Sequence, residues 1–427
     1  MVTRAETKGL PYGIGRFGAG AVVSILILLI VLAFGLYAYS LQLTEGEIVT
    51  GMRDVGIMGG APWGLYIAFE LYAAGIGFGA MILLAVVRLS GLDYLRSLSR
   101  PLGLLALAAL LAGGASVIVD LGQPLRALVN LAMYGRPASP FFGTFSIGLV
   151  SALILTAVYL YLDSRPDAAA LARRPSGWQG FLRFVAAGYR NTPAEQARRR
   201  HTSLALAILL IVVGATAAST SGWVFGIQQG RAGWYSALQA PASVVMAGVT
   251  GAGMLIIVLA VLRQTLGVKD KLSIRAFGWL SNLMLAFTLV YIYFIGAELL
   301  TSSYESDVHE SQLTRALLIG EFAPLFWISA GLLVVAAVAA GLQALFKRHY
   351  LGLIVLTALA VNAAALIKRY LIVVPSLTSG NLLPYGEGFY SPTWVEYLVV
   401  AALLTMGVLL YIVFSKVFPI LDVQDSQ

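Results

Sequence analysis

Three residues near the start of the second apolar segment have the types and spacing to handle a hydrogen-bonding ring ligand. Trp63, Tyr66 and Glu70 follow one another at helical spacing, so their side chains share one helix face. Glu70 lies about 8 residues inside the segment, roughly 12 Å deep at 1.5 Å per residue. A carboxyl group at that depth must hold its proton or have a partner, and either condition suits proton exchange with a bound ligand. A hydrogen bond to a neighbouring helix is the structural alternative.

A second acidic residue, Asp120, ends the third apolar segment within the sequence VDLGQP (119–124). Asp before Gly and Pro is common turn chemistry, which is the structural alternative for this residue. Arg126 follows closely and is a potential partner for the Asp120 carboxylate. We therefore expect two sets of site residues: Glu70 and Asp120 for proton exchange, and Trp63, Tyr66 and Arg126 as contacts for the ligand.

The other acidic groups at the ends of apolar segments occur on the same side as Glu70 and Asp120. They are Glu298, Glu321 and Glu396. Lys368 and Arg369, in the ninth apolar segment, are placed to neutralise some of these carboxylates. This side of the molecule is therefore expected to contain the acidic groups that lie in the spans or at their ends.

The elements that position these residues must be membrane-spanning helices. Of 427 residues, 59% are hydrophobic and 11% are charged, whereas soluble domains have about 25% charged residues. Only helices satisfy their backbone groups in lipid without a closed barrel, and each span needs about 20 apolar residues. We expect an all-α integral membrane protein with about ten spans, at 21–43, 62–87, 101–120, 142–162, 202–228, 242–265, 276–300, 316–346, 350–374 and 393–415.

The distribution of positive charge predicts the orientation of these spans. Of the 28 Lys and Arg residues, 21 fall on one side when the connections are assigned alternately. The positive-inside rule then predicts a multi-pass protein of the cell membrane with both termini in the cytoplasm. This arrangement also explains the net charge of +8 without a nucleic-acid partner.

The residue types that are missing exclude several kinds of site. The chain has no cysteine, which rules out disulfides, thiolate zinc sites and cysteine-ligated iron–sulfur clusters on this chain. His201 and His349 begin spans on one side and His309 lies on the other, so we expect no haem. No P-loop, nucleophile elbow or HExxH motif is present. Metal centres of any electron-transfer function are therefore expected on partner proteins.

A shift of 175 residues aligns two parts of the sequence. Arg88 then falls on Arg263, and each of these two arginines follows a glycine-rich apolar run; Arg100 falls on Arg275. Such a match predicts two four-helix bundles in a parallel repeat with the first and last spans at the periphery, although apolar sequences also match by chance. The expected parts are 1–61 with the first span, 62–228 as the first bundle with the ligand site, 242–374 as the second bundle, and 375–427 with the last span.

Five motifs follow one another along the chain: APWGLYIAFELYAAGIGFGA (61–80), VDLGQPLRALVNL (119–131), SPFFGTF (139–145), YSPTWVEYLVV (390–400) and KVFPIL (416–421). Their order and spacing resemble the NrfD/PsrC family, named for the membrane subunits of nitrite and polysulfide reductases. The last two motifs are similar to the longer branch of the family, with ten helices. That branch includes membrane subunits of hydrogenases, sulfite-reduction complexes and alternative complex III.

The resemblance implies a specific function. Members of this family exchange electrons and protons with the quinone pool, of menaquinone or ubiquinone type, through a site in the first bundle near the outer face. It also implies two kinds of partner: an extracytoplasmic subunit with four iron–sulfur clusters, and a catalytic subunit of molybdopterin, hydrogenase or cytochrome type. Some members have a histidine near the quinone, and none occurs in spans 2–4 here.

The hypothesis is therefore the quinone-reactive membrane subunit of a multi-subunit oxidoreductase. The alternative from another class is a secondary transporter or proton-conducting membrane protein without quinone chemistry. A transporter predicts a substrate site at the bilayer midplane. The carboxylates occur in the outer half instead, which favours the redox hypothesis.

Overall fold

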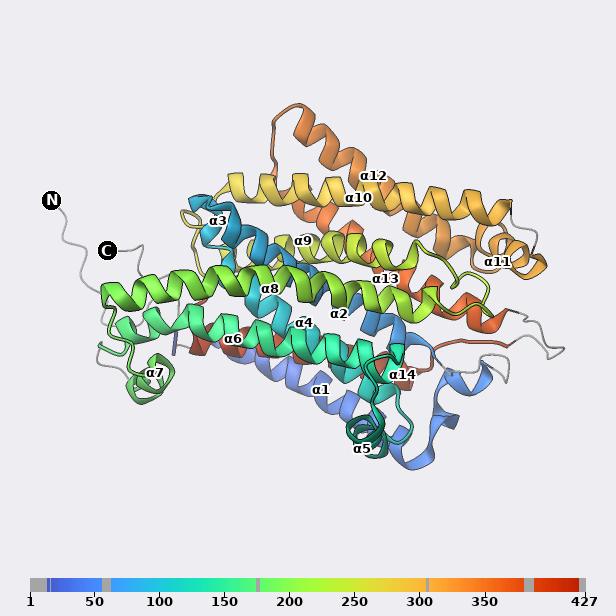
Figure 1. Ribbon diagram of the computed structural model, residues 1–427, viewed down its shortest axis with the longest axis horizontal. Coiled ribbons are helices and arrows are strands. Elements are labelled where there is room, and N and C mark those ends of the chain that lie inside the picture. The colour runs from blue at the N-terminus through green and yellow to red at the C-terminus, as the bar shows by residue number, and fades with distance from the viewer. Residues whose placement is uncertain are drawn as a thin grey trace.

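The computed structural model describes residues 14–15, 17–55, 63–173, 177–304, 307–379 and 388–421, except for the side chains of 140–142. All regular secondary structure in these ranges is helical, and ten helices are long and apolar enough to cross a membrane (Figure 1). The expected all-α integral membrane fold is confirmed. Pro62, where the second span was expected to begin, lies outside the described residues.

The ten spans contain eleven α-helices and one π-helical turn, because two of the spans combine two elements each. They are α1 (Ala19–Glu45), α2 (Leu65–Ser90), α3 with α4 (Asp93–Arg96 and Ser99–Asp120), η5 with α6 (Pro140–Phe145 and Ser146–Leu171), α8 (Pro193–Gly226), α9 (Gln239–Thr265), α10 (Ile274–Ser303), α12 (Ala323–Leu345), α13 (Leu351–Thr378) and α14 (Trp394–Val417). Three further helices are short: α5 (Pro124–Tyr134), α7 (Gln179–Ala186) and α11 (Val308–Leu318). Two 3-10 turns, η2 (Glu47–Val49) and η3 (Gly51–Asp54), follow α1.

The second span is the central helix of the protein. α2 packs against α4, α8, α9 and α13, and most of its side chains are buried. Gly79 on α2 and Gly251 on α9 meet at the helix crossing, where a Cβ on Gly79 would overlap the carbonyl of Ala247. Glycine lets helix backbones approach this closely in lipid. The site residues of α2 are therefore held in a rigid setting.

The spans pack as two sets of neighbours. One set contains α2, α4, α6 and α8, and the other contains α9, α10, α12 and α13. α1 packs along α14 at the edge, where its exposed apolar side chains, such as Leu26, Ile27 and Ile30, suit contact with lipid. The two sets share a continuous interface through α2. A repeated pair of bundles, 62–228 and 242–374, stays a prediction.

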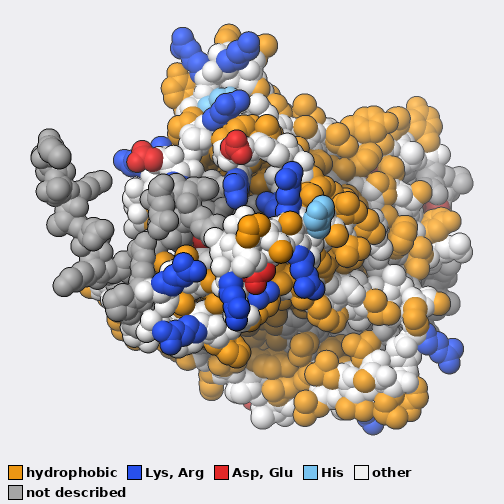
Figure 2. Space-filling view, turned by 60° about the vertical axis from the view of Figure 1, so that its left-hand side comes forward, with side chains coloured by type: hydrophobic (Ala, Val, Ile, Leu, Met, Phe, Trp, Pro, Cys, Tyr) orange, Lys and Arg blue, Asp and Glu red, His pale blue; other side chains and the backbone are white. Residues whose placement is uncertain are grey.

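Positive side chains gather at one end of the helices, which we call the basic end (Figure 2). The first and last described segments both reach this end, because the Gly15 N–H donates a 2.9 Å hydrogen bond to the Lys416 carbonyl. Arg100 is buried there and forms ion pairs with Asp163 and Asp167. Its guanidinium also donates to the carbonyls of Pro419 and Leu421.

The opposite end contains two helices that the apolar pattern did not predict. α5 and α11 each have 11 residues, too few to span a bilayer. No residue of α5 is buried, and Leu125 is 80% exposed. At the basic end, α8 begins nine residues before the predicted span, because Thr192 and Glu195 form a capping box and Pro193 occupies the first turn.

Candidate functional site

Four carboxylates converge beside the end opposite the basic end, and we call them the acidic cluster: Glu47, Glu70, Asp120 and Glu396. They come from η2, α2, the last residue of α4 and the first turn of α14. Asp120 interacts electrostatically with the other three. Among the described residues no group of three or more His, Asp or Glu side chains is arranged to hold a metal ion. The acidic cluster is therefore a candidate site for protons or for a hydrogen-bonding ligand.

Asp120 lies half-buried at the end of α4, on the same helix face as Gly114 and Val117, which are also half-buried. Its Oδ1 atom is buried and has no hydrogen-bond partner among the described residues. Arg126 does not supply one, because its guanidinium donates to Gln123 Oε1 at 3.1 Å. A buried carboxylate oxygen without a donor is costly, so Asp120 is suited to accept a hydrogen bond from a ligand.

Glu70 is buried in the middle of the packed helices, with 3% of its surface exposed. Its Oε1 atom also lacks a hydrogen-bond partner among the described residues. Arg369 on α13 is buried and interacts with Glu70 electrostatically, as expected from the charges of the ninth span. Arg369 Nη1 also donates to Ser243 Oγ at 3.3 Å. Glu70 is thus placed between the other members of the acidic cluster and a second group of charges.

Tyr66 is fully buried and its hydroxyl donates a 2.9 Å hydrogen bond to Gln42 Oε1. The amide nitrogen of Gln42 in turn donates to Glu47 Oε1 at 3.0 Å and to the Val119 carbonyl at 3.2 Å. Gln42 therefore joins α1, α2 and the end of α4. Tyr66 positions this network, with its ring inside the protein.

Trp63 packs against two aromatic residues, Phe225 at the end of α8 and Trp234 in the loop that follows. Its ring centroid lies 5.8 Å from that of Phe225 and 5.9 Å from that of Trp234. Trp234 Nε1 donates to the Ile372 carbonyl at 2.6 Å, which holds the group against α13. These rings form a cap over the entry of α2, and the stacking face expected for a ligand is directed at protein.

Glu396 is fully buried and well supplied with donors. Its carboxylate accepts hydrogen bonds from the Gly51 N–H at 2.7 Å, from the Thr393 N–H at 2.9 Å and from the Tyr390 hydroxyl. The Tyr390 oxygen also accepts from the Leu65 N–H at 2.6 Å. Burial raises the pKa of the Tyr390 hydroxyl well above its ordinary value, and the Glu396 charge adds to this effect.

Glu47 is the member of the acidic cluster that sequence reasoning missed. It follows the first span, in a connection whose sequence has no motif, and only its neighbours Gln42 and Thr50 identify it as part of a network. Burial raises the pKa of Glu47 above its ordinary value of 4.5, although the hydrogen bonds from Gln42 and Thr50 oppose this. The Glu396 charge adds a smaller increase.

A second group of charges lies in the other set of helices. Lys368 Nζ is 3.5 Å from Glu298 Oε2, as the sequence led us to expect for an outer carboxylate. Together with Arg369, Ser243 and Tyr291 these residues line a small cavity between α9, α10 and α13. Glu321 is exposed near the start of α12.

Two further cavities lie elsewhere in the described part of the chain. One is apolar and lies between α4, α6 and the segment after α14, and the other opens at the basic end between α2 and α8. Glu70, Tyr66 and Asp120 line none of these three cavities. What distinguishes Glu70 and Asp120 is therefore the buried carboxylate oxygen that each has without a hydrogen-bond partner among the described residues.

Comparison with known proteins identifies the family. The family model described as polysulphide reductase, NrfD, matches residues 55–379. The chain belongs to the NrfD family.

Relatives of this NrfD-family protein include three named components of reductase or oxidoreductase complexes. A Halobacterium salinarum protein named as a membrane subunit of dimethyl sulfoxide reductase is 30% identical over 74% of this chain and 68% of its own length. A selenate reductase subunit of Mesobacillus selenatarsenatis is 23% identical over 92% of each chain. The Hdr-like menaquinol oxidoreductase integral membrane subunit of Archaeoglobus fulgidus is 24% identical over 93% of each chain.

NrfD-family proteins are membrane subunits of oxidoreductase complexes and interact in general with quinones. The described residues fit such a ligand in one respect, since a quinol hydroxyl is a hydrogen-bond donor and Asp120 Oδ1 and Glu70 Oε1 lack donors. Glu396, in contrast, has three donors, which makes it a structural member of the acidic cluster.

Proposed function

We propose that this chain is the quinone-reactive membrane subunit of a respiratory complex, with its ligand site at Asp120. The observation that carries this proposal is the buried Asp120 Oδ1, which has no hydrogen-bond partner among the described residues. Membership of a quinone-interacting family supports it, as does the menaquinol in the name of the Archaeoglobus relative. A quinol oxidised at this site supplies two electrons and two protons.

Asp120 accepts a hydrogen bond from the ligand and takes up its proton. The other members of the acidic cluster favour this step, because their negative charges attract a proton to the same place. The ring is expected to approach Asp120 along the half-buried face of α4 that contains Gly114 and Val117.

Glu70 is the second proton-exchanging residue. It interacts electrostatically with Asp120 on one side and with Arg369 on the other. Arg369, Lys368 and Glu298 then continue a line of ionisable side chains along α13 and α10.

The remaining predicted site residues have supporting roles in this proposal. Tyr66 and Trp63 hold the acidic cluster in place, because their polar and aromatic contacts are made with protein. Arg126, which lies exposed on α5, is left for an anionic group of the ligand or of a partner.

We propose that electrons pass between this ligand and iron–sulfur clusters of a subunit bound at the end opposite the basic end. The names of the relatives support the presence of partners. The exposed helices α5 and α11 and the turns η2 and η3 offer a surface for such a subunit. The positive charge of the basic end supports a cytoplasmic position for the basic end itself. Both termini then lie on the cytoplasmic side of the cell membrane.

The test is quinol-linked turnover of the purified complex carrying D120N, E70Q or E321Q. Asn and Gln keep the size of the side chain and remove its ability to take up a proton. We expect D120N and E70Q to lower turnover at least ~100-fold, while E321Q, an exposed acidic residue near the same end, changes it less than about two-fold. Size-exclusion profiles establish that the complexes assemble. Normal quinol-linked turnover of the D120N complex would contradict the assignment of Asp120 as the ligand site.

The buried charges along α13 favour proton conduction as a second possible function. Intramembrane charges mark proton paths as well as ligand sites. Proton uptake by liposomes that contain the chain and no quinone distinguishes the two functions. Uptake that depends on Glu298 and Lys368, with turnover unaffected by D120N, would favour conduction alone.

A further inference from the structure

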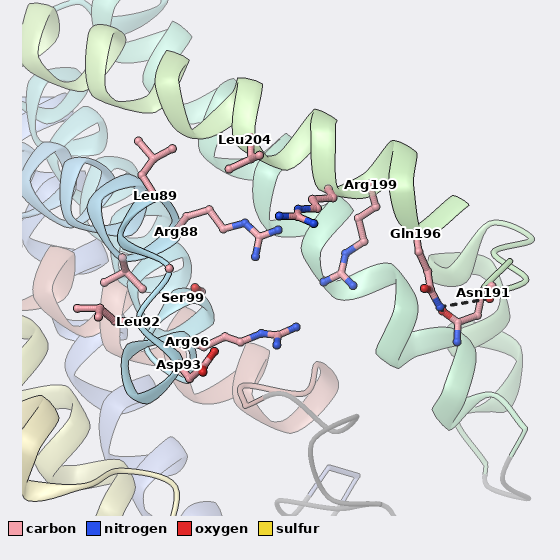
Figure 3. A pocket seen from close by; sticks show the side chains of 13 residues that line it. Arg88, Leu89, Leu92, Asp93, Arg96, Ser99, Asn191, Gln196, Arg199 and Leu204 are labelled. Atoms are coloured by element: carbon pink, nitrogen blue, oxygen red, sulfur yellow. Dashed lines mark hydrogen bonds between the residues drawn. The ribbon is translucent and has the colours of Figure 1, made fainter. Parts of the chain in front are cut away.

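The largest of the three cavities lies at the basic end, far along α2 from the acidic cluster. It has a volume of about 540 Å³ and opens between the α2–α3–α4 segment and the first half of α8. In Figure 3, the side chains of Arg88 and Arg96 extend from α2 and α3 into the same space as Arg199 of α8. The proposed quinone chemistry uses no residue of this cavity.

The charge of the lining is strongly positive. Four arginines, Arg88, Arg96, Arg199 and Arg200, line the cavity, and Asp93 is the one carboxylate among the lining residues. Asp163, which lies outside the lining, balances part of this charge through its 3.2 Å ion pair with Arg199. Arg88 Nε is buried and has no hydrogen-bond partner among the described residues. A buried guanidinium nitrogen without an acceptor favours an anion inside the cavity.

Neutral polar groups lie next to the arginines. Ser99 at the start of α4 lines the cavity, and so do Asn191 and Gln196, whose side chains are joined by a 3.0 Å hydrogen bond. Arginine presents a planar fork of donors that matches phosphate oxygens. The lining therefore suits a phosphate group together with hydroxyl groups close to it.

The rim of the same cavity is apolar. Leu89 and Leu92 are 41% and 40% exposed, and Leu204 lines the α8 side. One turn further along α8 from Leu204, Ile208 is 56% exposed on the same face. The arginines and leucines of the cavity lie next to one another at the end of α2. The end of a membrane-spanning helix is at the level of the lipid headgroups. A free phosphate ion makes no favourable contact with this apolar rim, whereas acyl chains can be buried against it.

We propose that this cavity binds the phosphodiester headgroup of an anionic phospholipid, with its acyl chains along Leu89, Leu204 and Ile208. Basic pockets between transmembrane helices at the cytoplasmic side bind such headgroups in general. The bound lipid joins α2, which carries Glu70, to α8, which packs against α2 along its length.

The first test measures lipid selectivity of the purified full chain. The chain is delipidated in neutral detergent and titrated with phosphatidylglycerol, cardiolipin or phosphatidylcholine, and bound lipid is counted by native mass spectrometry. We expect at least ~10-fold tighter binding of an anionic lipid than of phosphatidylcholine, and no competition from inorganic phosphate at equal concentration. Equal binding of the anionic and zwitterionic lipids would overturn the proposal, and so would displacement by inorganic phosphate.

The second test uses matched variants. R88Q/R200Q removes two cavity charges, whereas R183Q/R198Q removes two exposed charges outside the lining. Each cavity arginine is expected to contribute about five-fold, so R88Q/R200Q weakens anionic-lipid binding about 25-fold. R183Q/R198Q changes it less than about three-fold, and R88K/R200K falls between them because it keeps the charge without the planar fork.

Equal loss in R88Q/R200Q and R183Q/R198Q contradicts a defined site. If R88Q/R200Q does not fold, the lipid selectivity of the unaltered chain decides the question.

Discussion

The hydroxyl of Tyr390 donates a hydrogen bond to Glu396 and so ties the segment before α14 to the first turn of that helix. The same hydroxyl accepts from the Leu65 N–H at 2.6 Å, the first amide of α2. The Tyr390 ring occupies the space that a Cβ on Gly64 would need. The entry of the central helix is therefore fixed by a residue that is 325 positions away in the sequence.

Replacement of Tyr390 by Phe removes both hydrogen bonds and keeps the ring. We expect Y390F to lose about 1–3 kcal/mol of stability, because the buried Glu396 loses a donor and the Leu65 N–H loses its acceptor. Thermal unfolding in detergent measures this loss. Y397F is the control, since Tyr397 is 58% exposed and lies on the same helix as Glu396. Equal stability of the two variants would contradict the structural role of Tyr390.

Replacement of Glu47 by Gln changes how stability depends on pH. The pKa of Glu47 is raised in the folded protein, mainly by burial, so the protonated form is favoured there. Glu47 therefore destabilises the fold progressively as pH rises above its ordinary pKa of 4.5. We expect E47Q to be close to the unaltered chain near pH ~4 and more stable than it near pH ~7, as measured by unfolding temperature. A difference that stays constant across this pH range would refute this account.

Replacement of Gly79 by Ala forces α2 away from α9. The added methyl group meets the backbone of Ala247 and Gly251, which cannot move as a flexible side chain can. Overpacking of this kind costs about 1–3 kcal/mol. G331A on α12 is the control, because a Cβ there meets no atom within 4 Å. The yield of monodisperse protein and its unfolding temperature should fall for G79A and stay unchanged for G331A.

Replacement of Arg100 by Gln removes the guanidinium that Asp163 and Asp167 share, while Asp163 keeps its ion pair with Arg199. Breaking a buried ion pair costs about 3–5 kcal/mol, since an uncompensated charge remains. Arg53 provides the comparison, because its pair with Asp54 is 3.3 Å long and about half exposed. We expect R53Q to cost about 0–1 kcal/mol. If chemical unfolding gave similar losses for R100Q and R53Q, the buried network would have no special role.

The spans could be predicted from the sequence because lipid imposes one strong rule on apolar length. The first span was expected at 21–43 and occupies Ala19–Glu45, and the other nine also correspond. α5 and α11 were missed because short helices at a membrane surface need no long apolar run. α8 extends beyond its apolar part, because capping residues at Thr192 and Glu195 determine where it begins.

For the candidate site, the sequence indicated single residues and not their partners. Glu70 and Asp120 are unusual in their own segments, so each stood out alone. The partners of Tyr66 and Trp63 were not predictable, because Gln42, Phe225 and Trp234 are ordinary residues that only the tertiary fold brings near. The proposed pairing of Arg126 with Asp120 was wrong, because α5 directs Arg126 to Gln123 on the exposed side.

The contacts of Arg100 with Pro419 and Leu421 have a consequence for biogenesis. Both acceptors are more than 300 residues further along the chain, so they emerge from the ribosome long after Arg100 has entered the bilayer. During that interval the guanidinium depends on Asp163 and Asp167, which are translated much earlier. The contacts with Pro419 and Leu421 therefore form late in co-translational assembly, and a chain that stalls before residue 419 leaves the guanidinium without these two acceptors.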